Sequence, residues 1–275
     1  MASPDKPQVF TNSNPASVLI LTDSRGEGLD VVLDKEIKEN DLPIAFELDI
    51  VKGAKIQRLL HIALRKTRET HYDRIIIQGG ICNLTVREAI NDIKILSYYR
   101  GDQVEKLLQA IDELRDHFGY SVNIATILPA GLKKYYKHHL EISGAFDPAE
   151  EYTLISLRSQ QELLLEDIKY VNSKIVEGNK RLGIRTIDLD RQVLGQSVKK
   201  RRNKKKSKVF KVLKDQHLTD GVHPNEILAA RLHRRTCDGL LRDLGFSVST
   251  NHPAEHEDSE DWSPNESEDW DFKRQ

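Results

Sequence analysis

Short segments rich in apolar residues recur along the chain as far as residue 189, and each one is bounded by turn residues. They are residues 18–21, 44–51, 74–78, 121–128 and 183–189. An apolar run of this length between turn signals is typical of a strand that is buried on both faces. The pattern therefore predicts about five strands.

Helical periodicity fills most of the sequence between and after these runs. Apolar residues recur every three to four positions in residues 27–39, 54–69, 103–118, 154–181 and 225–244. Residues 133–152 follow neither period, and we expect an irregular insertion there. Strands that alternate with helices predict an α/β fold in which helices cover both faces of a parallel sheet. The site of such a sheet lies at the carboxyl ends of its strands.

Composition changes at both ends of this pattern. Residues 1–16 are polar and contain three prolines, which predicts a flexible lead. Residues 17–245 hold the alternating pattern and are expected to form one domain. Residues 246–275 are polar and acidic, and such a composition predicts a disordered tail.

Charge and cysteine content bear on the partners of the protein and on its cellular compartment. Charged residues make up 31% of the chain, but the formal net charge is only -1, so the overall balance indicates no partner. The two cysteines, Cys82 and Cys237, are too few for a disulfide framework. No signal-peptide core and no apolar run of ~20 residues is present in the sequence. We expect an intracellular protein, cytoplasmic or nuclear, without a membrane span.

Two separate segments carry candidate chemistry. Ser24 follows the first predicted strand, and Asp220 lies three residues before His223, just ahead of the last predicted helix. Asp220 can orient the His223 ring, so that the other ring nitrogen takes a proton from Ser24. This is the layout of a Ser-His-Asp site for acyl transfer. Each residue also has a simpler interpretation: Ser24 can cap the next helix with Glu27, and Asp220 and His223 can be turn residues.

The blocks around these residues resemble the SGNH, or GDSL-type, hydrolase superfamily. The segments 22–24, 51–54 and 220–223 correspond in order to its first, second and last motifs, with Thr22 where the family has Gly. Residues 172–188 fit its late helix and strand. The resemblance implies a flavodoxin-like three-layer α/β/α sandwich and a serine esterase or acyl hydrolase acting on a small acyl ester. It also implies catalysis by Ser24, Asp220 and His223 without a metal or other cofactor.

The third motif departs from the family pattern. The family has Gly-x-Asn-Asp, whose Asn donates to the oxyanion together with a Gly amide, here that of Gly53. This chain has Gly79-Gly80-Ile81-Cys82-Asn83, which puts Cys82 at the Asn position, unless a bulge restores Asn83. A thiol is a poor donor compared with an amide, so the substitution predicts a weakened enzyme. A buried, purely structural Cys82 is the alternative.

The same segments look most like SGNH-like domains in proteins encoded by animal retroelements. That resemblance opens a second interpretation, in which the domain is non-catalytic and binds RNA or protein. A dense basic loop at residues 199–208 is consistent with contacts to phosphates of a nucleic acid, although a solvated loop is the simpler reading. Its cations are Lys199, Lys200, Arg201, Arg202, Lys204, Lys205, Lys206 and Lys208.

The acidic tail contains a repeated motif. Ser-Glu-Asp-Trp occurs at 259–262 and again at 267–270, and Trp262 and Trp270 are the only tryptophans in the chain. The repeat suggests a protein partner, or a contact with the basic loop.

Overall fold

The computed structural model describes residues 15–90, 92–99, 101–199 and 208–246, and its centre is a parallel β-sheet. The strands are β1 (Ala16–Thr22), β2 (Ile44–Ile50), β3 (Arg74–Gln78) and β6 (Val122–Ile124), in the order β2-β1-β3-β6. The chain passes from β1 to β2 on one side and then to β3 on the other. The carboxyl ends of β1 and β3 therefore form the switch point at which ligands bind in such sheets.

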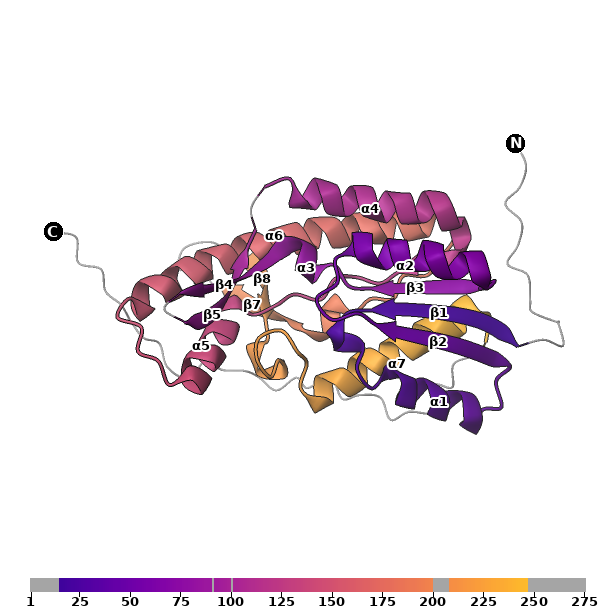
Figure 1. Cartoon of the computed structure of the whole chain (residues 1–275), viewed down its shortest axis with the longest axis horizontal. Coiled ribbons are helices and arrows are strands. Elements are labelled where there is room, and N and C mark those ends of the chain that lie inside the picture. Colours follow the sequence, from indigo (N-terminus) through magenta and orange to yellow (C-terminus); the bar gives the residue numbers. More distant parts are fainter. Residues whose placement is uncertain (1–14, 91, 100, 200–207, 247–275) are drawn as a thin grey trace.

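Helices cover both faces of this sheet (Figure 1). One face carries α2 (Ile56–Glu69), α4 (Gln103–Phe118) and α6 (Glu150–Arg181). The other carries α1 (Leu29–Glu39) and α7 (Glu226–Asp243). The chain thus forms the expected three-layer α/β/α arrangement.

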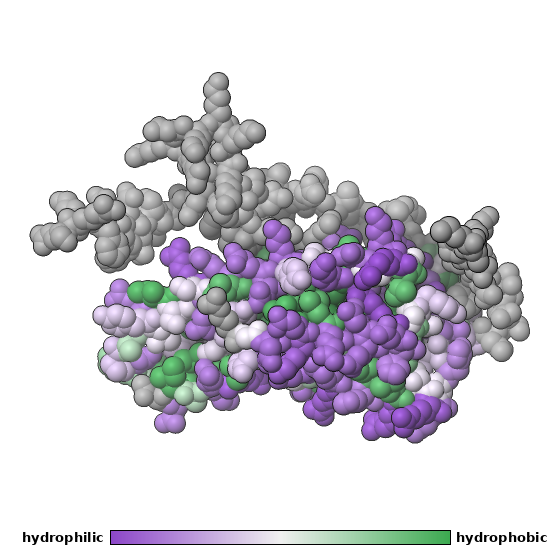
Figure 2. All heavy atoms as spheres, turned by 90° about the horizontal axis from the view of Figure 1, so that it is seen from above, coloured by the Kyte–Doolittle hydropathy of each residue, from purple (hydrophilic) through white to green (hydrophobic). Residues whose placement is uncertain are grey.

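Alternation along the strands explains this arrangement, because successive side chains of a strand point to opposite faces. Leu19 and Leu21 pack into the core under α2, α4 and α6, whereas Val18 and Ile20 pack into the core under α1 and α7. All four are fully buried. On the face seen in Figure 2, the described surface is mostly hydrophilic, with smaller apolar patches. Residues 18–21 of β1 and 75–77 of β3 are apolar on both sides because helices cover both faces of the sheet.

The prediction of a fifth strand at residues 183–189 is wrong. Residues 184–189 run beside β6, but they form no ladder: the Thr126 N–H donates to the Ile187 carbonyl at 3.0 Å, and side chains supply the other bonds. The Thr126 hydroxyl accepts the N–H groups of Leu189 and Asp190 at 2.7 and 3.1 Å, and Asn123 donates to the Arg185 carbonyl at 3.0 Å. These side chains take most of the backbone groups that strand pairing would use, so the described sheet has four strands.

The expectation of an irregular insertion at residues 133–152 is also wrong. This segment contains α5 (Leu132–Ser143) and the first residues of α6. The helix α5 buries Leu132, Tyr135 and Tyr136, which are three and four positions apart. The apolar face of α5 is not evident from the sequence, because lysines and histidines surround the two tyrosines.

Two hairpins were not predicted. The strands β4 (Thr85–Ile90) and β5 (Ile93–Tyr98) form an antiparallel pair directly after the short helix α3 (Ile81–Leu84). The strands β7 (Leu194–Lys199) and β8 (Lys208–Leu213) form a second pair, in which Lys199 lies opposite Lys208. The basic segment 200–207 connects the second pair and lies outside the described residues, as do residues 1–14 and the tail from residue 247.

Candidate active site

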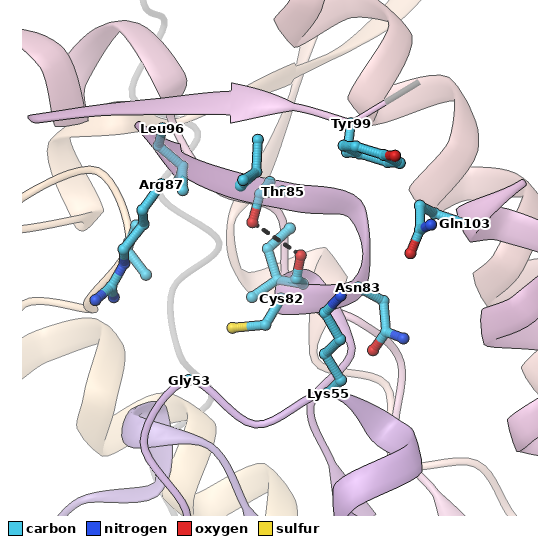
Figure 3. A pocket seen from close by; sticks show the side chains of 12 residues that line it. Gly53, Lys55, Cys82, Asn83, Thr85, Arg87, Leu96, Tyr99 and Gln103 are labelled. Atoms are coloured by element: carbon cyan, nitrogen blue, oxygen red, sulfur yellow. Dashed lines mark hydrogen bonds between the residues drawn. The ribbon is translucent and has the colours of Figure 1, made fainter. Parts of the chain in front are cut away.

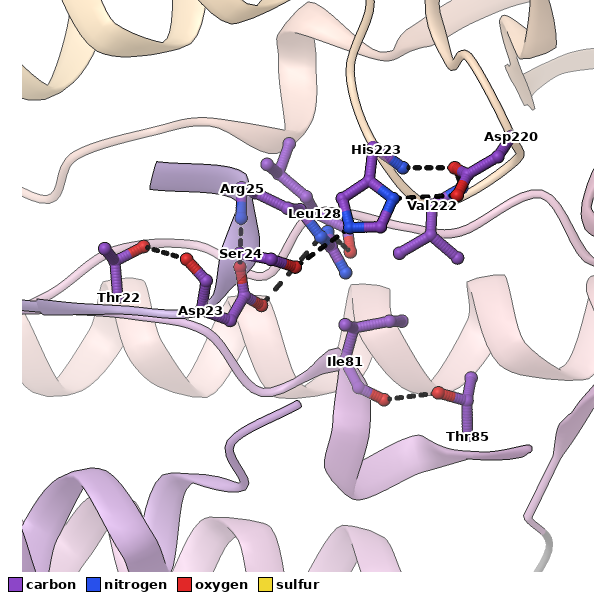
Figure 4. Close-up of polar contacts among 10 residues, drawn as sticks. All are labelled: Thr22, Asp23, Ser24, Arg25, Ile81, Thr85, Leu128, Asp220, Val222 and His223. Atoms are coloured by element: carbon purple, nitrogen blue, oxygen red, sulfur yellow. Dashed lines mark hydrogen bonds and ion pairs between the residues drawn. The ribbon is translucent and has the colours of Figure 1, made fainter. Parts of the chain in front are cut away.

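The structure brings Ser24 and His223 together although 199 positions separate them in the chain. The Ser24 Oγ atom lies 3.0 Å from Nε2 of His223. The Nδ1 atom of the same ring lies 2.8 Å from Oδ2 of Asp220. Figure 4 shows the three side chains in line, with the imidazole between the hydroxyl and the carboxylate. The expected nucleophile, base and orienting acid thus form one continuous hydrogen-bonded chain.

Ser24 sits in a short turn that follows β1. The turn is a single 3-10 helix, Ser24–Gly26, and Asp23 caps it by accepting the Arg25 N–H at 3.0 Å. Ser24 is therefore not the cap of a helix. The Glu27 carboxylate is also engaged elsewhere, because it pairs with Lys52 at 2.8 Å. The alternative role of Ser24 and Glu27 as a capping box is wrong.

Arg25 anchors this turn and is a residue that the sequence did not point to. Asp23 and Arg25 are 3% and 4% exposed, so both lie beneath the serine in the protein interior. The Arg25 guanidinium donates to the Leu128 carbonyl at 2.7 Å, which ties the serine turn to the segment that follows β6. Thr22, where the family has Gly, is buried and donates to the Asp23 carbonyl at 3.2 Å.

A tight turn fixes Asp220 relative to His223. The Asp220 Oδ1 atom accepts the N–H groups of Val222 and His223 at 2.9 and 2.7 Å. Gly221 has φ +87°, and a Cβ there would lie only 2.4 Å from the Gly131 carbonyl oxygen. A glycine is therefore required, because the turn presses against the start of α5.

The electrostatics of this turn keep Asp220 ionised. Burial alone would raise the pKa of Asp220, but hydrogen bonds from the His223 ring and from the N–H groups of His223 and Val222 outweigh burial and hold that pKa well below its ordinary value. An ionised Asp220 accepts a hydrogen bond from Nδ1–H of His223. In that tautomer the ring keeps a lone pair on Nε2, which faces Ser24. This is the protonation state that a general base requires.

Two backbone amides are available near Ser24. Gly53 follows β2, is exposed and has φ +68°. Among the described residues, neither the Ser24 N–H nor the Gly53 N–H donates to another group. Such free amides at the carboxyl ends of β1 and β2 are suited to hold the oxygen of a substrate carbonyl.

Cys82 and Asn83 differ in what they contact. The Asn83 side chain is 2% exposed, accepts the Ile56 N–H at 2.9 Å and donates to Gln57 Oε1 at 2.8 Å. It is therefore tied to the start of α2. Both residues line a cavity next to Gly53, and the Cys82 sulfur points into it (Figure 3). Of the two alternatives, this geometry favours Cys82 at the position where the family has its donor Asn.

Cys82 is a neutral thiol in this setting. Burial raises the pKa of Cys82, and the charge of Asp23 adds to that rise. Thiolate is the reactive form of cysteine, so a raised pKa argues against Cys82 as a nucleophile. Burial also raises the pKa of Cys237, to about 12, which leaves that second free thiol inert.

Within the described residues, no group of three or more His, Cys, Asp or Glu side chains could hold a metal ion. No helix in that part of the chain is long and apolar enough to cross a membrane.

Solved structures with the same fold include a lipase/acylhydrolase and a GDSL-like lipase. A lipase/acylhydrolase from Enterococcus faecalis matches with a TM-score of 0.55 at 11% identity, over 85% of this chain and 100% of that chain. A GDSL-like lipase from Bacteroides thetaiotaomicron matches with a TM-score of 0.51 at 13% identity, over 83% and 87% of the two chains. No protein-family model and no curated protein sequence matches this chain. The fold is therefore that of GDSL-type hydrolases.

Proposed function

We propose that this protein is a serine esterase of the SGNH type that hydrolyses small acyl esters at a reduced rate. The observation that carries the proposal is the chain of contacts from Ser24 through His223 to Asp220, at 3.0 and 2.8 Å. A serine hydroxyl is a weak nucleophile until a base removes its proton, and this arrangement supplies the base.

The reaction that follows from the geometry has two stages. His223 Nε2 takes the Ser24 hydroxyl proton while Oγ attacks the carbonyl carbon of the ester, and the amides of Ser24 and Gly53 hold the resulting oxyanion. The oxyanion collapses, the alcohol leaves with the proton from His223, and an acyl-serine remains. Water, deprotonated by His223, then releases the acid and restores Ser24.

Cys82 is the reason to expect a reduced rate. A family member would supply an amide N–H from this position, and a thiol is a weaker donor. Loss of one oxyanion donor costs about 10²–10³-fold in rate. The proposal therefore predicts a working but slow hydrolase.

Ester turnover tests this function directly. Purified full-length protein should hydrolyse p-nitrophenyl acetate and p-nitrophenyl butyrate, with a rate proportional to enzyme concentration. Ser24→Ala should reduce turnover to the level of a contaminant-free blank. Equal turnover by the protein and by Ser24→Ala would refute the proposal.

A second candidate is a non-catalytic module that binds RNA or protein, like the retroelement-encoded domains that the sequence resembles. The replacement of the donor Asn by Cys82 favours it, since a binding module needs no oxyanion donor. The basic segment at the end of the β7–β8 pair is the proposed contact with nucleic acid. RNA bound through phosphates should dissociate steeply as salt rises, and Ala at Lys204, Lys205 and Lys206 should flatten that dependence.

A further inference from the structure

A cavity of about 520 Å³ begins at the candidate oxyanion site. Gly53 and Val222 line one part of it, and Tyr99 and Gln103 line another. The β4–β5 hairpin forms one wall, through Thr85, Val86, Arg87 and Leu96. A volume of this size is within the range of sites for small ligands.

The charges in this cavity are all of one sign. Lys55 and Arg87 line it, and none of the described residues lining it is Asp or Glu. Figure 3 shows the two side chains on opposite sides of Cys82, with the Arg87 guanidinium on the side of Gly53. Burial raises the pKa of Cys82, and the positive charges of Arg87 and Lys55 both act against that rise. The electrostatic field of both cations therefore reaches the Cys82 sulfur, which lies next to the expected oxyanion.

Neither cation is neutralised by a carboxylate of the described chain. No ion pair joins Lys55 or Arg87 to another described residue. Lys52, three positions before Lys55, behaves differently, because Glu27 pairs with it at 2.8 Å. Two unpaired cations in one cavity with an otherwise uncharged lining indicate a ligand that carries negative charge.

We infer that the ester hydrolysed at this site carries an anionic group, a carboxylate or a phosphate, which Arg87 and Lys55 bind while the carbonyl lies at Ser24 and Gly53. The inference rests on the proposed esterase function and adds the class of its substrate. Arg87 is then a specificity-determining residue that the hairpin contributes. A guanidinium suits this role because its fork of N–H donors matches the oxygens of a carboxylate or a phosphate.

Paired substrates test this inference. The ratio of kcat/KM for mono-p-nitrophenyl glutarate to that for p-nitrophenyl butyrate compares an anionic with a neutral acyl group. Arg87→Gln should lower the ratio about fivefold, as expected for an exposed charge contact of about 1 kcal/mol. Arg87→Lys should retain most of the ratio, and rising salt should lower it in the parent protein. Lys94→Gln removes an exposed cation of the same hairpin outside the cavity, and it should leave the ratio unchanged.

Binding to the Ser24→Ala variant separates this inference from the esterase function. Calorimetry should show tighter binding of monomethyl glutarate, butyl phosphate or both than of methyl butyrate, and Arg87→Gln should remove the difference. Preference for only one anion would identify the group concerned. If the parent protein hydrolyses neither ester but the binding preference is present, the esterase proposal fails and the anion site stands. A ratio insensitive to Arg87→Gln, together with equal binding of charged and neutral ligands, would overturn the inference.

Discussion

The two halves of the candidate site differ in how completely they are equipped for ester hydrolysis. The nucleophile half, Ser24, His223 and Asp220, has every contact that proton transfer requires. The candidate oxyanion half, Gly53 and Cys82, offers a free backbone amide and a thiol, and it has no free side-chain amide. Apart from the Ser24 N–H, which belongs to both, the two candidate halves come from separate segments of the chain, so one half can weaken while the other remains intact.

Removal of the base should have the largest effect on the nucleophile half. His223→Ala leaves Ser24 without a proton acceptor, so kcat for p-nitrophenyl acetate should fall about 10⁶-fold, which is to the level of the blank. His71→Ala is a matched control, because His71 is exposed and precedes the amino end of β3, whereas the candidate site lies at the carboxyl ends of the strands. Substantial turnover by His223→Ala would mean that another group activates the nucleophile.

Asp220→Asn should lower kcat by less than His223→Ala does. The loss can be told apart from unfolding, because the substitution keeps the contacts that hold the turn. Asn keeps the oxygen that accepts the N–H groups of Val222 and His223, but it replaces Oδ2 with an NH₂ group that cannot accept from Nδ1. The ring should then adopt the wrong tautomer, and kcat should fall about 10²–10⁴-fold. Asp116→Asn on the exposed side of α4 is the control. A parent-like kcat would show that Asp220 does not set the tautomer.

Cys82→Asn should act in the opposite direction, on the oxyanion half. If Cys82 occupies the position of the missing donor, the new amide should raise kcat about 10–100-fold. Cys82→Ala is the matched variant, because it removes the thiol without adding a donor. Turnover of the Asn variant no higher than that of the Ala variant would contradict the assignment of this position.

The smallest predicted effect is that of Asp220→Asn on the free energy of unfolding. The pKa of Asp220 is lowered in the folded state, so its contribution is present above the unfolded pKa of about 3.9 and is lost as pH falls below it. Urea unfolding at pH 7 should show the parent about 1–2 kcal/mol more stable than Asp220→Asn. The difference should shrink at pH 3. A difference that is independent of pH would mean that the carboxylate charge does not stabilise the fold.

The sequence predicted the elements whose signals are local. β3 at residues 74–78 and α4 at residues 103–118 have the expected bounds, because a buried apolar run and an amphipathic stripe are complete within each segment. The segment 183–189 has the alternation of a strand, but Thr126 and Asn123 take its backbone groups. Those hydrogen bonds come from residues about 60 positions away in the chain, so no local pattern in the sequence predicts them.

The candidate site divides in the same way. Ser24, Asp220 and His223 could be proposed because the blocks that contain them have a recognisable order. The Arg25 anchor and the cavity with Arg87 could not, since both depend on which distant segments meet. The choice between Cys82 and Asn83 also required the contacts of Asn83 with Ile56 and Gln57.

Covalent labelling of the serine tests the central claim most directly, since it does not depend on the choice of ester. A serine-directed fluorophosphonate, incubated with the folded full-length protein, should add one adduct mass, and peptide mapping should place it on Ser24. His223→Ala should remove nearly all labelling, and His71→Ala should not. A well-folded parent protein with no adduct on Ser24, alone or after Cys82→Asn, would contradict the account and would leave a binding module as the function of this fold.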